Sequence, residues 1–315
     1  MRVLIPPIKS QGIKTKLVPW IQAITPDVAG RWIEPFFGTG VVGFNSGFRE
    51  AILSDTNPHL IRFYQGVKDG RITSSVVREY LRKEGEYLRK ANRNGYDHYT
   101  FVKDRFNQDH ASLDFLFLSR AGFNGMMRFN KKGGWNIPFC QKPERFSPAY
   151  ITKIVNQVHD VACLIQPGWQ FLNKSFDEVI PLATEHDIIY CDPPYMGRYV
   201  DYYAGWTEDD EYRLFQCLSA TKARFILSTW HHNDYRENDM VQKYWHRFNI
   251  VTRDHFYHSG AKIENRRSIV EALVFNFPAN IERHNHGVKP KLQQMMLFEE
   301  RARYIAQQLN RADVV

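Results

Sequence analysis

Residues 188–195 read IIYCDPPY, an apolar run that leads directly into a turn. An unbroken apolar run before a turn is typical of a buried strand in a parallel sheet. The turn contains Asp192, two prolines and Tyr195, and the prolines fix the backbone and remove N–H donors. An Asp-Pro turn after a strand is common in itself, but the second proline and the aromatic ring indicate a functional turn.

This turn has the groups needed to hold the exocyclic amine of a flat heterocycle. The nitrogen of such an amine is a poor nucleophile, because its lone pair is shared with the ring. Asp192 and the carbonyl oxygen of Pro193 can accept its two N–H bonds and push the lone pair out of conjugation. Tyr195 can stack on the ring. The turn therefore suits delivery of a methyl group to the amine nitrogen.

Strands and helices alternate on both sides of this stretch. Strands are predicted at 31–36, 50–55, 169–173, 187–191 and 224–228, with antiparallel strands near 247–277. Helices are predicted at 15–24, from Val41 onward, and at 58–68, 74–91, 111–120, 149–165 and 208–220. The alternation predicts an α/β fold with a doubly wound sheet, in which ligands bind beyond the carboxyl ends of the strands.

A helical and then basic segment interrupts the alternation. Residues 121–149 are rich in glycine, asparagine and cations, and a hairpin is expected to turn at Lys132-Gly133-Gly134. We predict a discontinuous domain at 1–58 and 150–280, an inserted, mainly helical domain at 59–149, and a polar tail at 281–315 with one helix.

Composition narrows the class of protein. The 315 residues are 43% hydrophobic and carry a net charge of +8, which favours a polyanionic partner, most simply nucleic acid. The first apolar run is too short for a signal peptide, and no stretch is long enough to span a membrane. We therefore expect a cytoplasmic protein. We expect neither a metal site nor disulfides, because the four cysteines form no C-x-x-C pair. His231 and His232 are expected on opposite faces of a strand, which argues against a metal pair.

A second strand end has the character of a cofactor site. Gly38 and Gly40 form a strand-to-helix turn after Glu34, and Asp55 ends the next strand, where an acid can take both ribose hydroxyls. This pairing fits NAD as well as S-adenosylmethionine. A third glycine at pyrophosphate spacing is absent, and Glu34 would repel a phosphate but attract an amino group, so S-adenosylmethionine is favoured. Lys14 is a candidate partner for the carboxylate of S-adenosylmethionine.

Together these segments resemble the Dam-like family of DNA adenine-N6 methyltransferases, in the order with the cofactor motif first. The similarity covers roughly residues 9–277, including Lys9–Ile21, Glu34–Gly40, Ser54–Asn57 and Asp192–Tyr195. Residues 122–139, GFNGMMRFNKKGGWNIPF, resemble the family's DNA-recognition stretch and are the most discriminating match; we call them the recognition stretch. One departure is Ser175, where the family often has an acid, so Phe176 or Asp177 is expected at the cofactor's adenine.

The resemblance implies a site-specific enzyme that transfers a methyl group from S-adenosylmethionine to N6 of a flipped-out adenine in double-stranded DNA, with GATC or a related site as the target. It implies a Rossmann-like methyltransferase sheet with an inserted target-recognition domain. The implied catalytic residues are Asp192, Pro193, Pro194 and Tyr195. The implied cofactor residues are Lys14, Glu34, Phe36, Gly38, Gly40, Asp55, Phe176 and Asp192. The implied DNA contacts are Asn124, Met126, Arg128, Asn130, Lys131, Lys132, Pro138, Arg145, Arg266 and Arg267.

Other functions fit parts of the pattern. A methyltransferase of RNA or of a protein amide faces the same conjugated amine, but such enzymes usually begin the turn with Asn and lack a module like 121–149. A catalytically dead DNA-binding repressor would not need Asp192, Tyr195, Gly38 and Asp55, and all four are present. A nicotinamide-dependent oxidoreductase would rest only on the glycine turn and Asp55. We further expect a monomer, encoded by a prokaryote or phage and acting on the nucleoid; pairing with a restriction endonuclease stays open.

Overall fold

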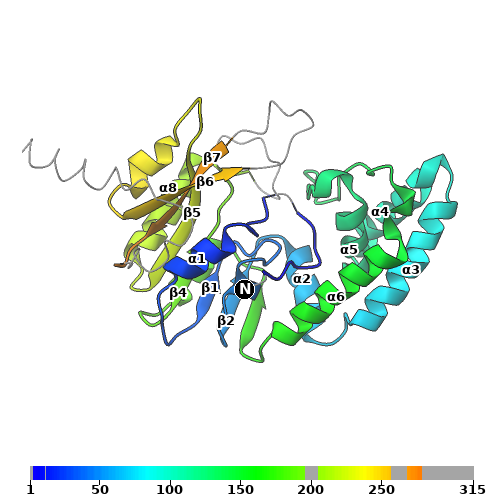
Figure 1. Ribbon diagram of the computed structural model, residues 1–315, viewed down its shortest axis with the longest axis horizontal. Coiled ribbons are helices and arrows are strands. Elements are labelled where there is room, and N and C mark those ends of the chain that lie inside the picture. Colours follow the sequence, from blue (N-terminus) through cyan, green and yellow to red (C-terminus); the bar gives the residue numbers. More distant parts are fainter. Residues whose placement is uncertain (1–2, 11, 196–204, 257–267, 279–315) are drawn as a thin grey trace, which may run out of the picture.

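The computed structural model describes residues 3–10, 12–195, 205–256 and 268–278. Figure 1 shows a twisted sheet on one side of the molecule and a group of helices on the other. Two of the expected DNA contacts, Arg266 and Arg267, and the expected tail at 281–315 lie outside the described residues. Among the helices of the described ranges, none is both long and apolar enough to cross a bilayer.

A sheet of seven strands forms the centre of the described chain. Its order is β3 (Trp169–Leu172), β2 (Ala51–Ser54), β1 (Trp32–Glu34), β4 (Ile188–Cys191), β5 (Arg224–His232), β7 (Ser268–Phe275) and β6 (Asn249–Phe256). The first five strands are parallel, and β7 runs antiparallel to both of its neighbours. The chain moves outward from β1 to β3 and then returns to β4, so the strand order reverses between β1 and β4. In such sheets a crevice opens at this reversal.

Both faces of the sheet are covered, which confirms the predicted doubly wound α/β fold. Successive residues of β4 alternate between two apolar clusters, with Ile188 and Tyr190 in one and Ile189 and Cys191 in the other. Helices α1 (Val18–Ile24) and α2 (Pro58–Lys68) contribute to the first cluster. Helices α7 (Phe176–Val179) and α8 (Glu208–Ala220) contribute to the second. Because β4 is buried on both sides, its sequence is apolar throughout.

The helical part contains α3 (Ser74–Lys90), α4 (Tyr96–Asp109), α5 (Ser112–Ala121) and α6 (Pro148–Leu164). Helix α6 packs against α3, although the predicted boundary at 149/150 assigns α6 to the sheet domain; that boundary stays a prediction. Helix α4 was not predicted. It buries Tyr99, Val102 and Phe106 at helical spacing, but polar residues surround these three and its mean hydropathy is low, so the apolar stripe is hard to recognise.

The predicted helix from Val41 is wrong. The structure has only a short 3₁₀ turn there, η1 (Gly43–Asn45). Gly40 and Gly47 adopt positive φ angles of 83° and 81°, which an α-helix cannot contain. The side chain of Asn45 then fixes the loop, because its Nδ2 donates to the carbonyl oxygens of Val41 at 2.7 Å and Leu4 at 2.9 Å.

The expectation for His231 and His232 is also wrong. Strand β5 extends to His232 and contains a bulge between Trp230 and His232, where its register against β7 shifts. A bulge breaks the alternation of side chains, and the two Nδ1 atoms therefore lie 2.8 Å apart. Burial and the neighbouring His232 both lower the pKa of His231. Within the described ranges, no third metal-ligating side chain joins the pair.

Candidate active site

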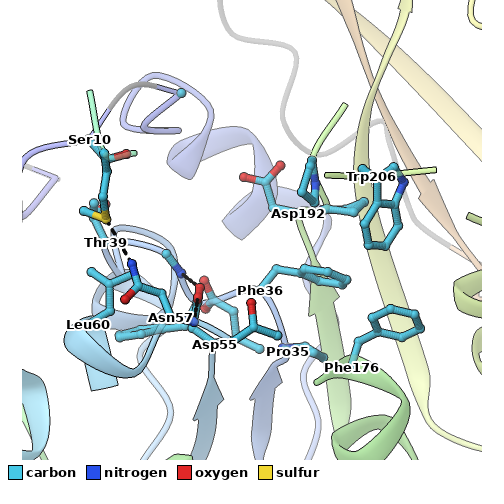
Figure 2. A pocket seen from close by; sticks show the side chains of 18 of the residues that line it. Ser10, Pro35, Phe36, Thr39, Asp55, Asn57, Leu60, Phe176, Asp192 and Trp206 are labelled. Carbon is cyan, nitrogen blue, oxygen red and sulfur yellow. Dashed lines mark hydrogen bonds between the residues drawn. The ribbon is translucent and has the colours of Figure 1, made fainter. Parts of the chain in front are cut away.

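Three acids that the sequence places at strand ends meet around one cavity. Glu34 is the last residue of β1, Asp55 follows β2, and Asp192 follows β4. All three line a cavity of about 310 Å³. Figure 2 shows Asp55 and Asp192 on different walls of this pocket. Because β1, β2 and β4 are neighbouring parallel strands, their carboxyl ends bring the acids to the same edge of the sheet, beside the reversal of strand order.

The two glycines of the turn after β1 have different roles. Gly40 is buried, and a Cβ added to it would lie 2.4 Å from the ring of Phe37, so only glycine fits there. Gly38 has a φ angle of 51°, and a Cβ added to it would meet nothing within 4 Å. Gly38 lines the cavity, whereas Gly40 packs behind the turn. The predicted cofactor residues Lys14, Phe36 and Phe176 also line the cavity.

Asp55 is held in place by backbone amides. Its Oδ2 accepts the N–H of Gly38 at 2.7 Å, and its Oδ1 accepts the N–H of Asn57 at 2.8 Å. Burial raises the pKa of Asp55, while these two hydrogen bonds oppose the rise. A carboxylate oxygen can accept more than one hydrogen bond, so Asp55 keeps the capacity to bind hydroxyl groups of a ligand.

Glu34 is a buried carboxyl group with one indole partner. Its Oε2 accepts the Nε1–H of Trp32 at 2.8 Å. Burial raises the pKa of Glu34 well above its ordinary value; the bond from Trp32 opposes this, and the nearby Asp192 and Asp55 add to it. A positively charged ligand group next to Glu34 would stabilise the ionised carboxylate and so oppose this rise in its pKa. The site therefore favours a cationic ligand.

Asp192 has an ion-pair partner within the chain. The Nζ of Lys14 lies 2.9 Å from its Oδ1, and the side chains of Lys14 and Asp192 are 7% and 20% exposed. Burial raises the pKa of Asp192, and Lys14 opposes the rise. Lys14 also lies 4.6 Å from the ring centre of Tyr195. The sequence suggested a ligand carboxylate as the partner of Lys14, whereas the structure pairs it with Asp192.

Aromatic side chains form one end of the cavity. The ring of Phe36 stacks on Phe176 at 5.5 Å and meets Trp206 edge-on at 5.5 Å. Figure 2 shows the three rings together on the side of Asp192. Sequence reasoning missed Trp206. It precedes Thr207, the cap of α8, and an apolar residue at that position usually signals packing at a helix start and not a ligand wall.

Charged residues surround this aromatic end. Arg213 lies over the ring of Phe176 at 5.2 Å and lines the cavity. The carboxylate of Asp177, expected as a substitute acid for the cofactor's adenine, is held instead by Arg213 and the hydroxyl of Ser175. Asp210, on α8, also lines the cavity.

The recognition stretch contains the predicted hairpin. Phe129 and Trp135 form an antiparallel bridge, and the N–H of Asn130 donates to the carbonyl oxygen of Gly134 at 2.8 Å. Trp135 is buried, and its Nε1–H donates to the hydroxyl of Tyr99 on α4 at 3.0 Å. Its ring also meets Phe106 and Phe115 edge-on. The hairpin is thus anchored to α4 and α5.

The expected DNA contacts in this stretch and its flank differ in exposure. Asn124, Asn130, Lys131, Lys132 and Pro138 are exposed, whereas Met126, Arg128 and Arg145 are partly buried. The Nη2 of Arg128 donates to the carbonyl oxygen of Asn136 at 3.1 Å, which holds the guanidinium along the hairpin. The Oδ1 of Asn130 accepts the N–H groups of Lys132 and Gly134, so Asn130 also stabilises the turn.

Two methionines connect the recognition stretch with the cavity. Met126, which was expected to contact DNA, lines the cavity together with Met127. The Nδ2 of Asn57 lies 3.2 Å from the sulfur of Met127, a contact drawn in Figure 2. Arg145 is turned toward the helices, where its Nη1 donates to the carbonyl oxygen of Arg120 at 2.6 Å.

Comparisons with known proteins agree with this geometry. A family model described as D12 class N6 adenine-specific DNA methyltransferase matches residues 10–259. The DNA adenine methylase of Vibrio cholerae is 33% identical over 68% of the chain and 76% of its own length. The type II methyltransferase M1.LlaDCHI of Lactococcus lactis is 24% identical over 85% of the chain and 94% of its own length. Among solved structures, an rRNA methyltransferase from Streptomyces viridochromogenes covers 82% of both chains at 10% identity with a TM-score of 0.31, which is too weak to argue from.

Proposed function

Because the chain belongs to the D12 class of N6 adenine-specific DNA methyltransferases, we propose that the cavity between β1, β2 and β4 is where its cofactor and its target adenine meet. The enzyme methylates N6 of adenine in DNA. The cofactor we assign to the cavity is S-adenosylmethionine. The observation that carries this proposal is the convergence of Glu34, Asp55 and Asp192 from three strands on one cavity.

The residues around the cavity fit S-adenosylmethionine. Glu34 suits a ligand with positive charge, and Asp55 suits the ribose hydroxyls. The rings of Phe36, Phe176 and Trp206 offer flat surfaces for an adenine. Gly38 leaves open space where a side chain would intrude. Bound here, S-adenosylmethionine would supply a methyl group that its positively charged sulfur already activates.

The chain's own residues orient the target amine. An adenine inside a duplex cannot reach a cavity at a strand end, so it must be flipped out, which costs a few kcal/mol. Asp192 and the carbonyl oxygen of Pro193 would accept the N6 hydrogens, while Tyr195 would stack on the base. Pro193 and Pro194 hold the turn rigid. The side chain of Asp192 is 20% exposed at the cavity, and a carboxylate oxygen can accept more than one hydrogen bond, so the ion pair with Lys14 leaves capacity for these hydrogens.

We assign DNA reading to the recognition stretch. Arg128 is the first candidate for a bidentate contact with a guanine, and Asn124 is the second candidate for a base edge. Lys131, Lys132 and Arg145 would contact phosphates. Asn130, Met126 and Pro138 would shape the surface between these contacts. The target is GATC or a related site, and Arg266 and Arg267 stay candidate phosphate contacts.

One experiment tests the cofactor, the substrate and the target site together. Plasmid DNA is incubated with the enzyme and labelled S-adenosylmethionine, and single-molecule sequencing then gives the modified base and its context. We expect label on N6 of adenine at GATC or a related sequence. Label transferred to RNA but not to DNA, or no label on either nucleic acid, would contradict the proposal.

We propose in addition that the enzyme acts as a metal-independent monomer in the cytoplasm of a prokaryotic or phage-infected cell. Light scattering of the purified protein, alone and with a target duplex, measures its mass. Methyl transfer in the presence of a chelator tests the metal. A dimeric mass, or loss of transfer on chelation, would contradict these two points. If the enzyme is paired with a restriction endonuclease, a nuclease of the same sequence specificity should be found in the same host.

A further inference from the structure

A buried acid lies behind the catalytic turn. Glu271 is fully buried in the middle of β7, within the apolar run from Ile269 to Phe275. Its Oε2 accepts the hydroxyl hydrogen of Tyr195 at 2.6 Å. Sequence reasoning missed Glu271, because an acid in an apolar strand has no local pattern that indicates its partner. Burying a carboxylate is costly unless it is hydrogen-bonded, so this contact needs an explanation.

The contact fixes the long axis of the Tyr195 side chain at both ends. At one end, Pro193 and Pro194 restrict the backbone from which the ring projects. At the other end, Glu271 holds the hydroxyl. Lys14 lies over the ring at 4.6 Å from its centre. A tyrosine held in this way cannot swing its ring about the Cα–Cβ bond without breaking a buried bond to a carboxylate.

The register of the sheet places Glu271 at this position. Strand β7 lies between β5 and β6, and Glu271 is paired with Trp230 on β5 and with Arg253 on β6. Two strands therefore brace the residue from both sides. The acceptor for Tyr195 is thus part of the sheet and not of a loop, which makes its position well defined.

We propose that Glu271 is a positioning residue for methyl transfer: it holds Tyr195 so that the ring face, and not the hydroxyl, meets the target adenine. This inference rests on the proposed function, in which Tyr195 stacks on the flipped base. Glu271 contacts neither base nor cofactor in this scheme. It acts on the reaction through Tyr195.

The test compares variants that remove the hydroxyl, the acceptor or the ring. Tyr195→Phe keeps the stacking ring and removes the hydroxyl, Glu271→Gln keeps size and an acceptor oxygen, and Glu271→Leu removes the acceptor. The double variant Tyr195→Phe/Glu271→Leu removes both partners, and Tyr195→Ala removes the ring. For each variant we would measure the single-turnover rate of methyl transfer, the Kd for S-adenosylmethionine, the melting temperature, and the fluorescence of 2-aminopurine at the target position.

We expect Tyr195→Phe and Glu271→Leu each to slow transfer about 10-fold, because the buried hydrogen bond is lost and the ring loses its anchor. The double variant should be no slower than either single variant, since both changes break the same bond. Glu271→Gln should keep more of the rate than Glu271→Leu. The Kd for S-adenosylmethionine should change by less than about 2-fold in all of them.

Two outcomes would overturn the inference. The first is a wild-type transfer rate in Tyr195→Phe, a variant that removes the hydroxyl but keeps the volume of the core, and therefore stays informative even if Glu271→Leu fails to fold. The second is a fall in cofactor affinity and melting temperature that matches the fall in rate, which would make Glu271 a structural residue of the sheet. Tyr195→Ala distinguishes a failure of this inference from a failure of the proposed function. A wild-type rate and unchanged 2-aminopurine fluorescence in this variant would contradict the proposed stacking of Tyr195 on the base.

Discussion

The cavity and the recognition stretch are built in opposite ways. Around the cavity, half-buried acids at strand ends are held by the protein itself, as in the pairs of Asp192 with Lys14 and of Asp55 with the backbone of Gly38. In the recognition stretch, the buried side chains are apolar, with Trp135, Ile137 and Phe139 in the core, and the polar side chains of Lys131 and Lys132 are exposed.

The difference follows from what each region has to do. Methyl transfer needs a few polar groups fixed in a dry site, where their interactions are strong and need no rearrangement. Reading DNA needs polar side chains that water or a base edge can reach, on an anchor that does not move. We therefore expect substitutions in the cavity to remove activity, and substitutions in the recognition stretch to redirect it.

The sharpest test of the cavity is Asp192→Ala. Transfer of a tritiated methyl group should fall by about 1,000-fold or more, because both orientation and electrostatic stabilisation of the amine are lost. Cofactor binding, measured by calorimetry, should stay nearly intact. Asp69→Ala is a matched control, since Asp69 is an exposed acid paired with Arg71 and should keep full activity. A wild-type rate in Asp192→Ala would remove this residue from the mechanism.

The recognition stretch is tested by Arg128→Ala against Lys132→Ala. The first should lower discrimination at one base position by about 10- to 100-fold, the value of a good bidentate contact. The second should weaken binding to all duplexes and reduce the salt slope by about one unit. Binding of duplexes with single base changes, measured at several salt concentrations, distinguishes the two. If Arg128→Ala weakens every duplex equally, Arg128 is a phosphate contact.

Trp206→Ala tests whether the aromatic end belongs to the cofactor site. The loss of one of the three rings at this end should weaken S-adenosylmethionine binding about 10-fold, with the sequence preference unchanged. Tyr212→Ala, which removes an exposed ring of the neighbouring helix α8, provides the control. Should Trp206→Ala bind the cofactor with wild-type affinity, the adenine end would have to lie elsewhere.

The smallest expected effect is on stability and concerns Asp187, which lies before β4 at the end away from the cavity. Its substitution should leave the cavity and the recognition stretch unchanged. Asp187 accepts hydrogen bonds from Arg31 and Thr184 that outweigh its burial and lower its pKa to about 2, from 3.8. The stabilisation from this depressed pKa is present above about pH 4 and is lost as the pH falls toward 2. Asp187→Asn should therefore cost about 1–2 kcal/mol at neutral pH and flatten the acid end of the stability profile.

Urea unfolding between pH 2 and pH 7 measures this effect, and methyl transfer at neutral pH is the control. The activity per folded molecule should equal that of the wild type, because Asp187 precedes β4 whereas the cavity lies beyond its carboxyl end. An unchanged stability at pH 7 in Asp187→Asn would show that the pair with Arg31 contributes nothing to the fold.

The sequence alone determined the features that depend on a few adjacent residues. The apolar run before Asp192, the glycine turn after Glu34 and the hairpin at Lys132 were predicted and are present, because propensity, burial pattern and turn chemistry act locally. The same local reasoning failed from Val41 onward, where the glycines at 40 and 47 with positive φ prevent a helix. It also failed at His231 and His232, where a bulge breaks the expected alternation of side chains between the two faces of the strand.

The tertiary structure decided which distant residues became partners. Lys14 lies against Asp192, Trp206 joins Phe36, and Tyr195 bonds to Glu271, a residue 76 positions later in the chain. Alternation of strands and helices predicts a sheet, but it does not fix the order of strands or the register of β7 against β5. Those contacts form only when the whole sheet closes, because the free energy that selects them comes from packing the two apolar clusters and not from any short segment.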